Sequence, residues 1–391
     1  MFEHIVAKRT GRLHTESAFQ ILSRAKALEA QGKHIVHMEI GQPDFKTPQN
    51  IIDAAHKAMN DGFTNYTPTP GLPQTRQAIA EYAAKYKNVK TSAEEVIIVP
   101  GAKPIIFYTM LMLIQPGDEV IYPNPSFPIY ESCIDFAGGT PVPFALRPEN
   151  NFEIDTEAFK KLLTPKTKLV ILNSPSNPTG GVYSLENMLA IADILRDRPD
   201  ILILSDEIYD RLVFDGSAVS IASLPGFKDR TIILDGLSKT YAMTGWRLGY
   251  GIMHPELIKH MDLLMVNSNS CAAAFTQIAA IEALSGPQEA VEEMKVSFLE
   301  RRNWLVEALN AIPGISCRLP KGAFYVFPDV SSFGITSSEF ASRLMEEGGV
   351  AASSGTSFGK FGEGHIRLSY ATSLDNIKLA VERILAFTKT L

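Results

Sequence analysis

Cysteine is scarce in this sequence, which has three cysteines in 391 residues. Cys133, Cys271 and Cys317 lie far apart and form no C-x-x-C pair, the spacing typical of zinc and redox sites. His34 and His37 are close together, but no acidic or cysteine ligands gather around them in the sequence. We therefore expect three small, buried, apolar cysteines, no disulfide framework and no metal site.

The sequence also lacks long apolar runs and an excess of positive charge. Its longest apolar stretch, residues 104–114, is shorter than the roughly 20 residues that a membrane-spanning helix needs, and residues 1–12 lack the apolar segment of a signal peptide. Lys and Arg number 37 against 43 Asp and Glu, without a polybasic block. We expect a cytoplasmic protein with neither a nucleic-acid nor a membrane partner.

Strand and helix patterns alternate through the middle of the chain, which is long enough for more than one core. Short β-branched runs lie between helical segments at residues 95–99, 119–122, 168–172, 201–204 and 231–234. Such near-continuous apolar strands indicate a sheet buried on both faces. The fold class is therefore α/β, with a mostly parallel sheet covered by helices.

The two ends of the chain have a different pattern. Residues 16–31 are expected to form a helix that ends at Gly32, and Thr47-Pro48 is expected to cap and begin a helix that ends at Gly62. After a long helical stretch at residues 287–311, short strands at 315–318, 323–327 and 365–370 mix with two helices. We predict a large domain at residues 48–286 and a smaller α+β domain at 287–391. Residues 1–47 are expected to join the small domain, with a small-molecule site in the cleft between the two domains.

Polar motifs follow three of the expected strands directly. They are Ser238-Lys239-Thr240, Asp206-Glu207-Ile208-Tyr209, and the run from Asn173 to Gly180. A lysine alone is usually a solvated surface charge. However, the carboxyl ends of parallel strands meet at one edge of a sheet, where open α/β sheets bind ligands. The sequence therefore predicts one site that contains all three motifs.

These motifs occur together with others in an order typical of one family. The further elements are Gly41-Gln42-Pro43-Asp44-Phe45, Asn65-Tyr66-Thr67-Pro68, Asn177-Pro178-Thr179-Gly180, Gly245-Trp246-Arg247 and Arg367-Leu368-Ser369. Over nearly its whole length the sequence resembles the class I/II aminotransferases, which are fold-type I pyridoxal-phosphate enzymes and include the bacterial aspartate aminotransferases. The resemblance implies that the large domain binds pyridoxal 5'-phosphate and that the protein is a homodimer with shared active sites.

The resemblance also assigns catalytic roles. Lys239 would carry the cofactor as an imine and then move the substrate's α-proton, because a desolvated lysine can lose its proton near neutral pH. Asp206 would keep the pyridine nitrogen protonated. Tyr209 and Asn177 would donate hydrogen bonds to the phenolic oxygen of the cofactor.

Other residues would hold the cofactor's phosphate and ring. A strand-to-helix turn, a hydroxyl and a guanidinium suit a phosphate dianion. The phosphate residues implied are Gly101, Ala102, Lys103, Ser238, Arg247 and, from the second subunit, Tyr66. Phe127 would stack on the ring, although aspartate-specific members often have Trp in this place.

Arg367 is expected to bind the substrate's α-carboxylate through two parallel hydrogen bonds, with the Gly41 backbone and the Asn177 side chain as helpers. No second cation is equally marked for a dicarboxylic side chain. Arg12, Lys103 and residues of the partner subunit remain open as alternatives.

The reaction implied is transamination between an L-amino acid, aspartate-like by resemblance, and a 2-oxo acid such as 2-oxoglutarate, within amino acid metabolism and biosynthesis. A C–S lyase, an amino-acid oxidase, or an aminotransferase for alanine or aromatic amino acids could use the same residues, because the cofactor supplies the difficult chemistry. A non-catalytic regulator would be expected to carry a basic appendage or to lack the lysine. A nicotinamide oxidoreductase would need a G-x-G-x-x-G motif after an early strand, which the sequence lacks.

Overall fold

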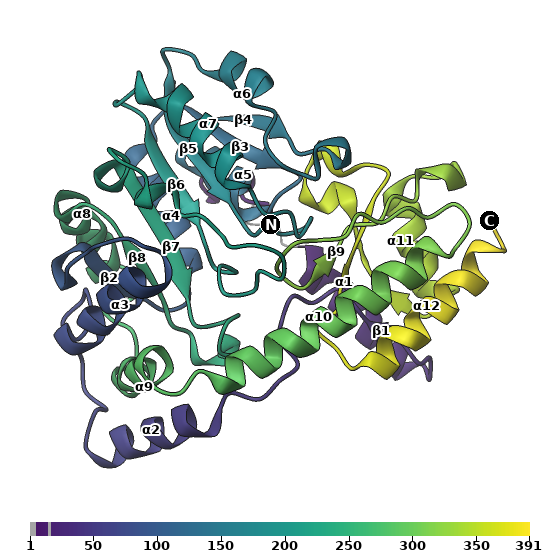
Figure 1. The fold of residues 1–391 in the computed structure, drawn as a ribbon, viewed down its shortest axis with the longest axis horizontal. Coiled ribbons are helices and arrows are strands. Elements are labelled where there is room, and N and C mark those ends of the chain that lie inside the picture. The colour runs from purple at the N-terminus through teal and green to yellow at the C-terminus, as the bar shows by residue number, and fades with distance from the viewer. Residues whose placement is uncertain (1–4, 15–16) are drawn as a thin grey trace.

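A seven-stranded sheet forms the centre of the computed structural model, which describes residues 5–14 and 17–391 (Figure 1). Its strand order is β2-β8-β7-β6-β5-β3-β4. The strands are β2 (Val96–Val99), β3 (Glu119–Asn124), β4 (Thr140–Ala145), β5 (Thr167–Asn173), β6 (Leu202–Asp206), β7 (Thr231–Gly236) and β8 (Gly249–Ile252). All neighbours pair in parallel except β8, which is antiparallel to both β2 and β7. The prediction of a mostly parallel sheet is confirmed.

Two strands of this sheet were not predicted, for identifiable reasons. β4 contains Pro141 and Pro143, which cannot donate to a ladder and are tolerated because β4 lies at the edge. β8 has the sequence Gly-Tyr-Gly-Ile and so lacks a β-branched run. Its glycines are required by close packing, since a Cβ on Gly249 would lie 2.5 Å from the backbone nitrogen of Ala102.

Helices cover both faces of the sheet, and the strands bury side chains toward each. In β2, Ile97 and Val99 join one apolar cluster while Val96 and Ile98 join another, as the two-residue period of a strand requires. One face is covered by α4 (Lys103–Leu113), α5 (Ile129–Ala137) and α8 (Pro255–Val266). The other is covered by α3 (Pro73–Tyr86), α6 (Thr156–Leu162), α7 (Leu185–Arg196) and α9 (Ala274–Ser285), with α2 (Gln49–Asn60) packed on α9.

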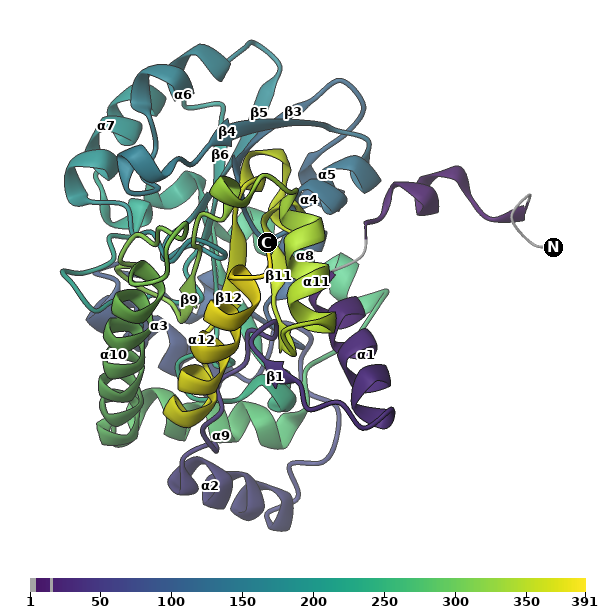
Figure 2. The ribbon, with the colours of Figure 1, turned by 90° about the vertical axis from the view of Figure 1, so that its right-hand side faces the viewer.

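The long helix α10 (Glu289–Asn310) leads from the large sheet to a smaller α+β part (Figure 1). There α11 (Ser337–Glu346) and α12 (Leu374–Thr388) accompany two small sheets, and α12 packs beside α10 (Figure 2). One sheet has the order β11-β12-β9 and is antiparallel. Its strands are β9 (Tyr325–Val326), β11 (Ser353–Ser354) and β12 (Ile366–Ser369).

The N-terminal segment packs on this smaller part. Strand β1 (Val36–His37) pairs in parallel with β10 (Val350–Ala351), and α1 (Ser17–Ala30) packs against β10 and β11. Gly32 follows α1 with a positive φ of 87°, as expected for a helix end, whereas Glu16 lies outside the described residues. The domain boundaries at residues 47 and 286 remain predictions.

Two local predictions were wrong. The expected strand at residues 315–318 forms only one bridge, Ser316 to Asp329, because the side chain of Asn310 takes both backbone groups of Cys317. At the start of α2, Pro48 occupies the cap position and Thr47 does not cap the helix. The Thr47 hydroxyl instead donates to the carbonyl of Ala242 at 2.8 Å.

The cysteines and histidines play local roles. Cys133 and Cys317 are buried, Cys271 is half-buried, and all three are free thiols. His37 lies between the carboxylates of Glu29 and Glu39, and the described residues contain no His, Cys, Asp and Glu group suited to a metal ion. Among the same residues, no helix combines the length and apolarity needed to cross a membrane.

Candidate active site

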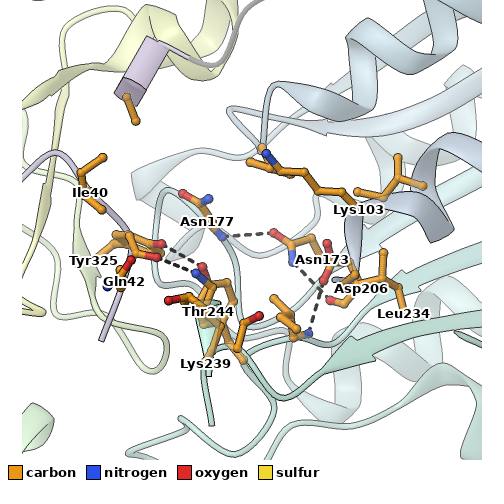
Figure 3. Close-up of a pocket in the computed structure, with 18 of the residues that line it drawn as sticks. Ile40, Gln42, Lys103, Asn173, Asn177, Asp206, Leu234, Lys239, Thr244 and Tyr325 are labelled. Atoms are coloured by element: carbon orange, nitrogen blue, oxygen red, sulfur yellow. Dashed lines mark hydrogen bonds between the residues drawn. The ribbon is translucent and has the colours of Figure 1, made fainter. Parts of the chain in front are cut away.

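A cavity of about 310 Å³ lies at the carboxyl ends of β5, β6 and β7, facing the smaller part of the molecule. In Figure 3, Ile40, Gln42 and Tyr325 lie on one side of it, and Asn173, Asp206 and Leu234 on the other. The sheet register places Asn173 opposite Asp206 on neighbouring strands. The three polar motifs therefore meet in one cavity, as the sequence predicts.

Asp206 is buried at the base of this cavity. One carboxylate oxygen accepts a 2.5 Å hydrogen bond from the Tyr130 hydroxyl, and the other accepts from the backbone N–H of Ile208 at 3.3 Å. Burial raises the pKa of Asp206 to about 6, although both hydrogen bonds act in the opposite direction. Any cation placed beside this carboxylate would favour its ionised form.

Lys239 reaches into the cavity from the segment after β7. Its Nζ donates to the carbonyl of Gly41 at 2.5 Å and lies 5.8 Å from the centre of the Phe324 ring. No side chain would fit at position 41, because a Cβ on Gly41 would lie 1.9 Å from the Tyr325 hydroxyl oxygen. Glycine therefore allows the N-terminal segment to approach both the lysine and the tyrosine.

Arg367, on β12, is buried between aromatic faces. Its guanidinium carbon lies 4.6 Å from the centre of the Tyr325 ring and 4.7 Å from that of Phe358. One Nη donates to the Asn177 side chain at 3.0 Å, the other donates to the carbonyl of Glu39, and Nε has no hydrogen-bond partner. All its acceptors within the described structure are neutral, so a substrate carboxylate would supply its counter-charge.

The turn between β2 and α4 faces Arg247. Gly101 has a φ of +80°, and a Cβ there would lie 2.0 Å from Nη2 of Arg247. Arg247 itself has a positive φ of 54°, a conformation that non-glycine residues rarely adopt outside functional or tightly constrained sites. Ala102, Lys103 and Ser238 complete this end of the cavity. The N–H groups of a first helical turn and a guanidinium together suit a phosphate.

Aromatic residues form a further wall. Phe127 lines the cavity and contacts the Tyr130 ring edge to face, with centroids 5.9 Å apart. The Nζ of Lys103 lies 5.3 Å from the centre of the Phe127 ring and 6.0 Å from that of Phe19 on α1. Opposite them, the hydroxyls of Tyr209 and Tyr325 are hydrogen-bonded at 2.8 Å.

Most site residues expected from the sequence line this cavity. They are Gly41, Ala102, Lys103, Phe127, Asn177, Asp206, Tyr209, Ser238, Lys239, Arg247 and Arg367. Gly101 is part of the adjoining turn, and Tyr66 is 91% exposed on the loop between α2 and α3. Arg12 lies near Gly138 and is not among the residues that line the cavity.

Several lining residues were missed by sequence reasoning. Tyr130 and Tyr325 meet Asp206 and Tyr209 across 76 and 116 residues of sequence, respectively, and no local pattern marks those contacts. Phe19 is a single apolar residue of α1, and the helical pattern does not mark it as part of a site. Asn173 belonged to a motif expected in the site but was given no role. It ends β5, and its side chain bonds both the Asn177 N–H and the Asp206 carbonyl.

Comparison with known proteins places this geometry in a family. The model of the family described as aminotransferase class I and II matches residues 33–384. The aspartate aminotransferase of Geobacillus stearothermophilus is 42% identical, over 98% of each chain.

Solved structures show the same relationship. The aspartate aminotransferase of Rhizobium meliloti superposes with a TM-score of 0.94 at 36% identity, over 98% of each chain. An alanine aminotransferase of Pyrococcus furiosus gives 0.93 at 31% identity, over 99% of this chain and 100% of that one. With one family model covering most of its residues and relatives aligned from end to end, the chain belongs to the class I and II aminotransferases.

Proposed function

We propose that this aminotransferase binds pyridoxal 5'-phosphate in the cavity and moves an amino group between an aspartate-like L-amino acid and a 2-oxo acid such as 2-oxoglutarate. The observation that carries the proposal is the convergence of Lys239, Asp206 and Arg367 on one cavity from distant parts of the chain. The names of the Geobacillus and Rhizobium relatives support aspartate as the amino donor.

The residues present fit the cofactor. A buried carboxylate, Asp206, suits a protonated ring nitrogen, and the Gly101 turn leaves no room for a Cβ beside the Arg247 guanidinium. Ser238 would add a hydroxyl to the phosphate, and Phe127 a flat ring face to the pyridine. Asn177 and Tyr209 would donate to the phenolic oxygen.

When bound, pyridoxal phosphate supplies an aldehyde that reacts with amines and a ring that withdraws electrons from the substrate's α-carbon. The protein's own residues position the substrate and move protons. Arg367 would hold the α-carboxylate, with Asn177 and the Gly41 backbone beside it. The Nζ of Lys239 would take the proton from the α-carbon as a general base.

Lys103 is our proposed partner for the side-chain carboxylate of aspartate. The cations that line the cavity in the described structure are Lys103, Lys239, Arg247 and Arg367, and the last three have the roles given above. The Nζ of Lys103 lies at the aromatic wall, near the rings of Phe127 and Phe19, and is the remaining cation that could pair with a second carboxylate.

A direct test is amino-group exchange with the purified protein and added cofactor. We expect aspartate and 2-oxoglutarate to give oxaloacetate and glutamate, at a higher kcat/KM than alanine or aromatic amino acids. Release of ammonia with pyruvate would indicate a lyase, and release of peroxide an oxidase; either as the main reaction would contradict the proposal. A homodimer and a cytoplasmic location also remain proposals.

A further inference from the structure

A second charged cluster lies behind the strand ends that form the active site. Successive side chains of a strand point to opposite faces, so Asp206 and Leu234 line the cavity while Glu207 and Asp235 point away from it. The backbone N–H of Glu207 donates to the carbonyl of Leu234 at 2.9 Å, which holds the two strand ends together. Glu207 is therefore one residue along the chain from Asp206, and Asp235 is one residue along from Leu234, the strand partner of Asp206.

Lys87, which follows α3, occupies the centre of this rear cluster. Its Nζ lies 3.2 Å from a carboxylate oxygen of Glu207 and 2.9 Å from one of Asp235, and it also contacts the carboxylate of Asp210. The side chain of Lys87 is 1% exposed, and those of its three partners 2–7%. Water therefore screens these charges little.

Negative charge is in excess in this cluster. Three carboxylates surround one ammonium, and one oxygen of Asp210 has no hydrogen-bond partner. The Tyr250 hydroxyl donates to Asp235 at 2.8 Å, and Ser205 and Ser220 donate to Glu207 at 2.8 and 2.6 Å. The nearby Arg211 is paired with Glu292 at 2.9 Å. Among residues 5–14 and 17–391, Lys87 is thus the cation that forms ion pairs with these carboxylates.

The ionisation of Asp206 depends on the balance of charge in this rear cluster. On its own side it faces the Tyr130 hydroxyl, the Lys239 ammonium and the Tyr209 hydroxyl, and Glu207 is its neighbour in the chain. A buried carboxylate is harder to ionise when other uncompensated anions lie close to it. Removing the Lys87 charge would leave such anions directly behind it.

We propose that Lys87 is a positioning residue for the charge of Asp206: by neutralising the carboxylates behind the strand ends, its ammonium keeps Asp206 ionised at neutral pH. The catalytic meaning of this role rests on the proposed function, because an ionised Asp206 is what would pair with a protonated ring nitrogen. The effect on Asp206 itself needs no cofactor.

The coupling to Asp206 runs through Glu207, whose charge raises the pKa of Asp206, while the Lys239 charge lowers it. Burial raises the pKa of Asp206 to about 6 and that of Asp235 to about 7, and the Lys87 charge opposes the rise at Asp235. Burial alone would lower the pKa of Lys87, but its three carboxylates raise it, so the ammonium stays charged. Asp206 therefore titrates close to neutral pH, where a nearby change of charge alters its ionisation.

The test is an infrared titration of the full chain without cofactor. The signal of the protonated Asp206 carboxyl is assigned by its loss in Asp206→Asn, and its midpoint is followed with pH. We expect Lys87→Met, which keeps the length of the stem, to raise the midpoint by about one pH unit. Glu207→Gln removes the neighbouring anion but keeps the side-chain size, so it should lower the midpoint.

A matched control separates the effect of the Lys87 charge on Asp206 from the general effect of removing a buried cation. Arg302 is also buried and pairs with Asp215 at 2.6 Å, so Arg302→Met should leave the midpoint unchanged. The double variant Lys87→Met with Glu207→Gln removes one charge of each sign and should return the midpoint toward that of the wild type. If Lys87→Met does not fold, the double variant and Glu207→Gln still decide the matter.

Equal midpoints in the wild type, Lys87→Met and Glu207→Gln would overturn the proposal, as would an equal shift in Arg302→Met. In the holoenzyme, we expect Lys87→Met to retain the cofactor and to show a lower kcat at neutral pH, with KM little changed. Failure of the proposed function would instead appear as a wild-type protein without transamination, whatever the titration shows.

Discussion

The guanidinium of Arg367 combines two features at the level of a single residue: it is buried, and its hydrogen-bond acceptors are all neutral. Burying a charge is costly unless it is paired, so this residue is poised to take up an anion. The stacking of the planar group between Tyr325 and Phe358 fixes its orientation. A lysine ammonium at this position would lose both the fork of donors and the stacking.

We therefore predict that Arg367→Lys raises KM by about 10- to 100-fold for every amino acid and every 2-oxo acid, the scale of one or two charged hydrogen bonds. Steady-state kinetics with aspartate, alanine and their 2-oxo acids would measure this. A loss confined to dicarboxylic substrates would instead make Arg367 the side-chain determinant.

Unlike Arg367, Lys103 should affect only the substrates that carry a second carboxylate. We expect Lys103→Met to raise KM about tenfold for aspartate and 2-oxoglutarate, because it removes one charged partner, and to leave alanine and pyruvate nearly unaffected. Methionine keeps an unbranched stem beside Phe127, so general damage to the wall is small. An equal loss for all four substrates would show that Lys103 does not recognise the side chain.

At the scale of secondary-structure elements, α1 is joined to the smaller part through His37. Its two ring nitrogens lie 2.8 Å from a carboxylate oxygen of Glu39 and 3.0 Å from one of Glu29, which is on α1. Burial alone would lower the pKa of His37, but the hydrogen bonds to both carboxylates outweigh it and the pKa is raised. The protonated ring therefore links α1 to the segment that carries Gly41.

The raised pKa of His37 makes the stability of the folded protein depend on pH in a definite direction. A pKa that is higher in the folded state contributes stability that is fully present below the unfolded value, about 6.5, and is lost as the pH rises through the folded value. We predict that His37→Gln lowers the free energy of unfolding more at about pH 6 than at about pH 9. Urea unfolding of both proteins at the two pH values would measure this, and a difference independent of pH would contradict it.

The strands of the large sheet could be predicted from the sequence to within about two residues, because buried parallel strands are continuous apolar runs. The strands β4 and β8 were not predicted, because proline in β4 and glycine in β8 interrupt the apolar run. In the site, residues that follow strand ends were predictable because chain order fixes their place. Tyr130 and Tyr325 were not, since their contacts depend on how the helices and the smaller part pack.

At the scale of the whole molecule, Tyr66 indicates how two subunits would combine. Its ring is 91% exposed on the loop after α2, and it is not among the residues that line its own subunit's cavity. Aromatic residues are enriched at protein–protein interfaces. We propose that its hydroxyl reaches the phosphate site of the second subunit.

Subunit mixing would test this arrangement. A Lys239→Ala subunit and an inactive Tyr66 variant should regain activity on mixing, because one of the two sites in a mixed dimer would then contain both wild-type residues. The matched control mixes Lys239→Ala with Arg367→Ala, two residues that line the same subunit's cavity. Each site of that mixed dimer keeps one substitution, so no activity should return. Mixed dimers demonstrated by mass but without recovered activity would place Tyr66 outside the partner's site.

We propose that Lys239 is the covalent anchor of the cofactor and the proton-moving group of the reaction. The most direct measurement is borohydride reduction of the holoenzyme followed by peptide mass analysis. We predict cofactor attached at Lys239 alone, and a Lys239→Ala variant that keeps its fold but loses several orders of magnitude in turnover. Cofactor found on another lysine, or a Lys239→Ala variant with a tenth of the wild-type rate, would contradict this role of Lys239.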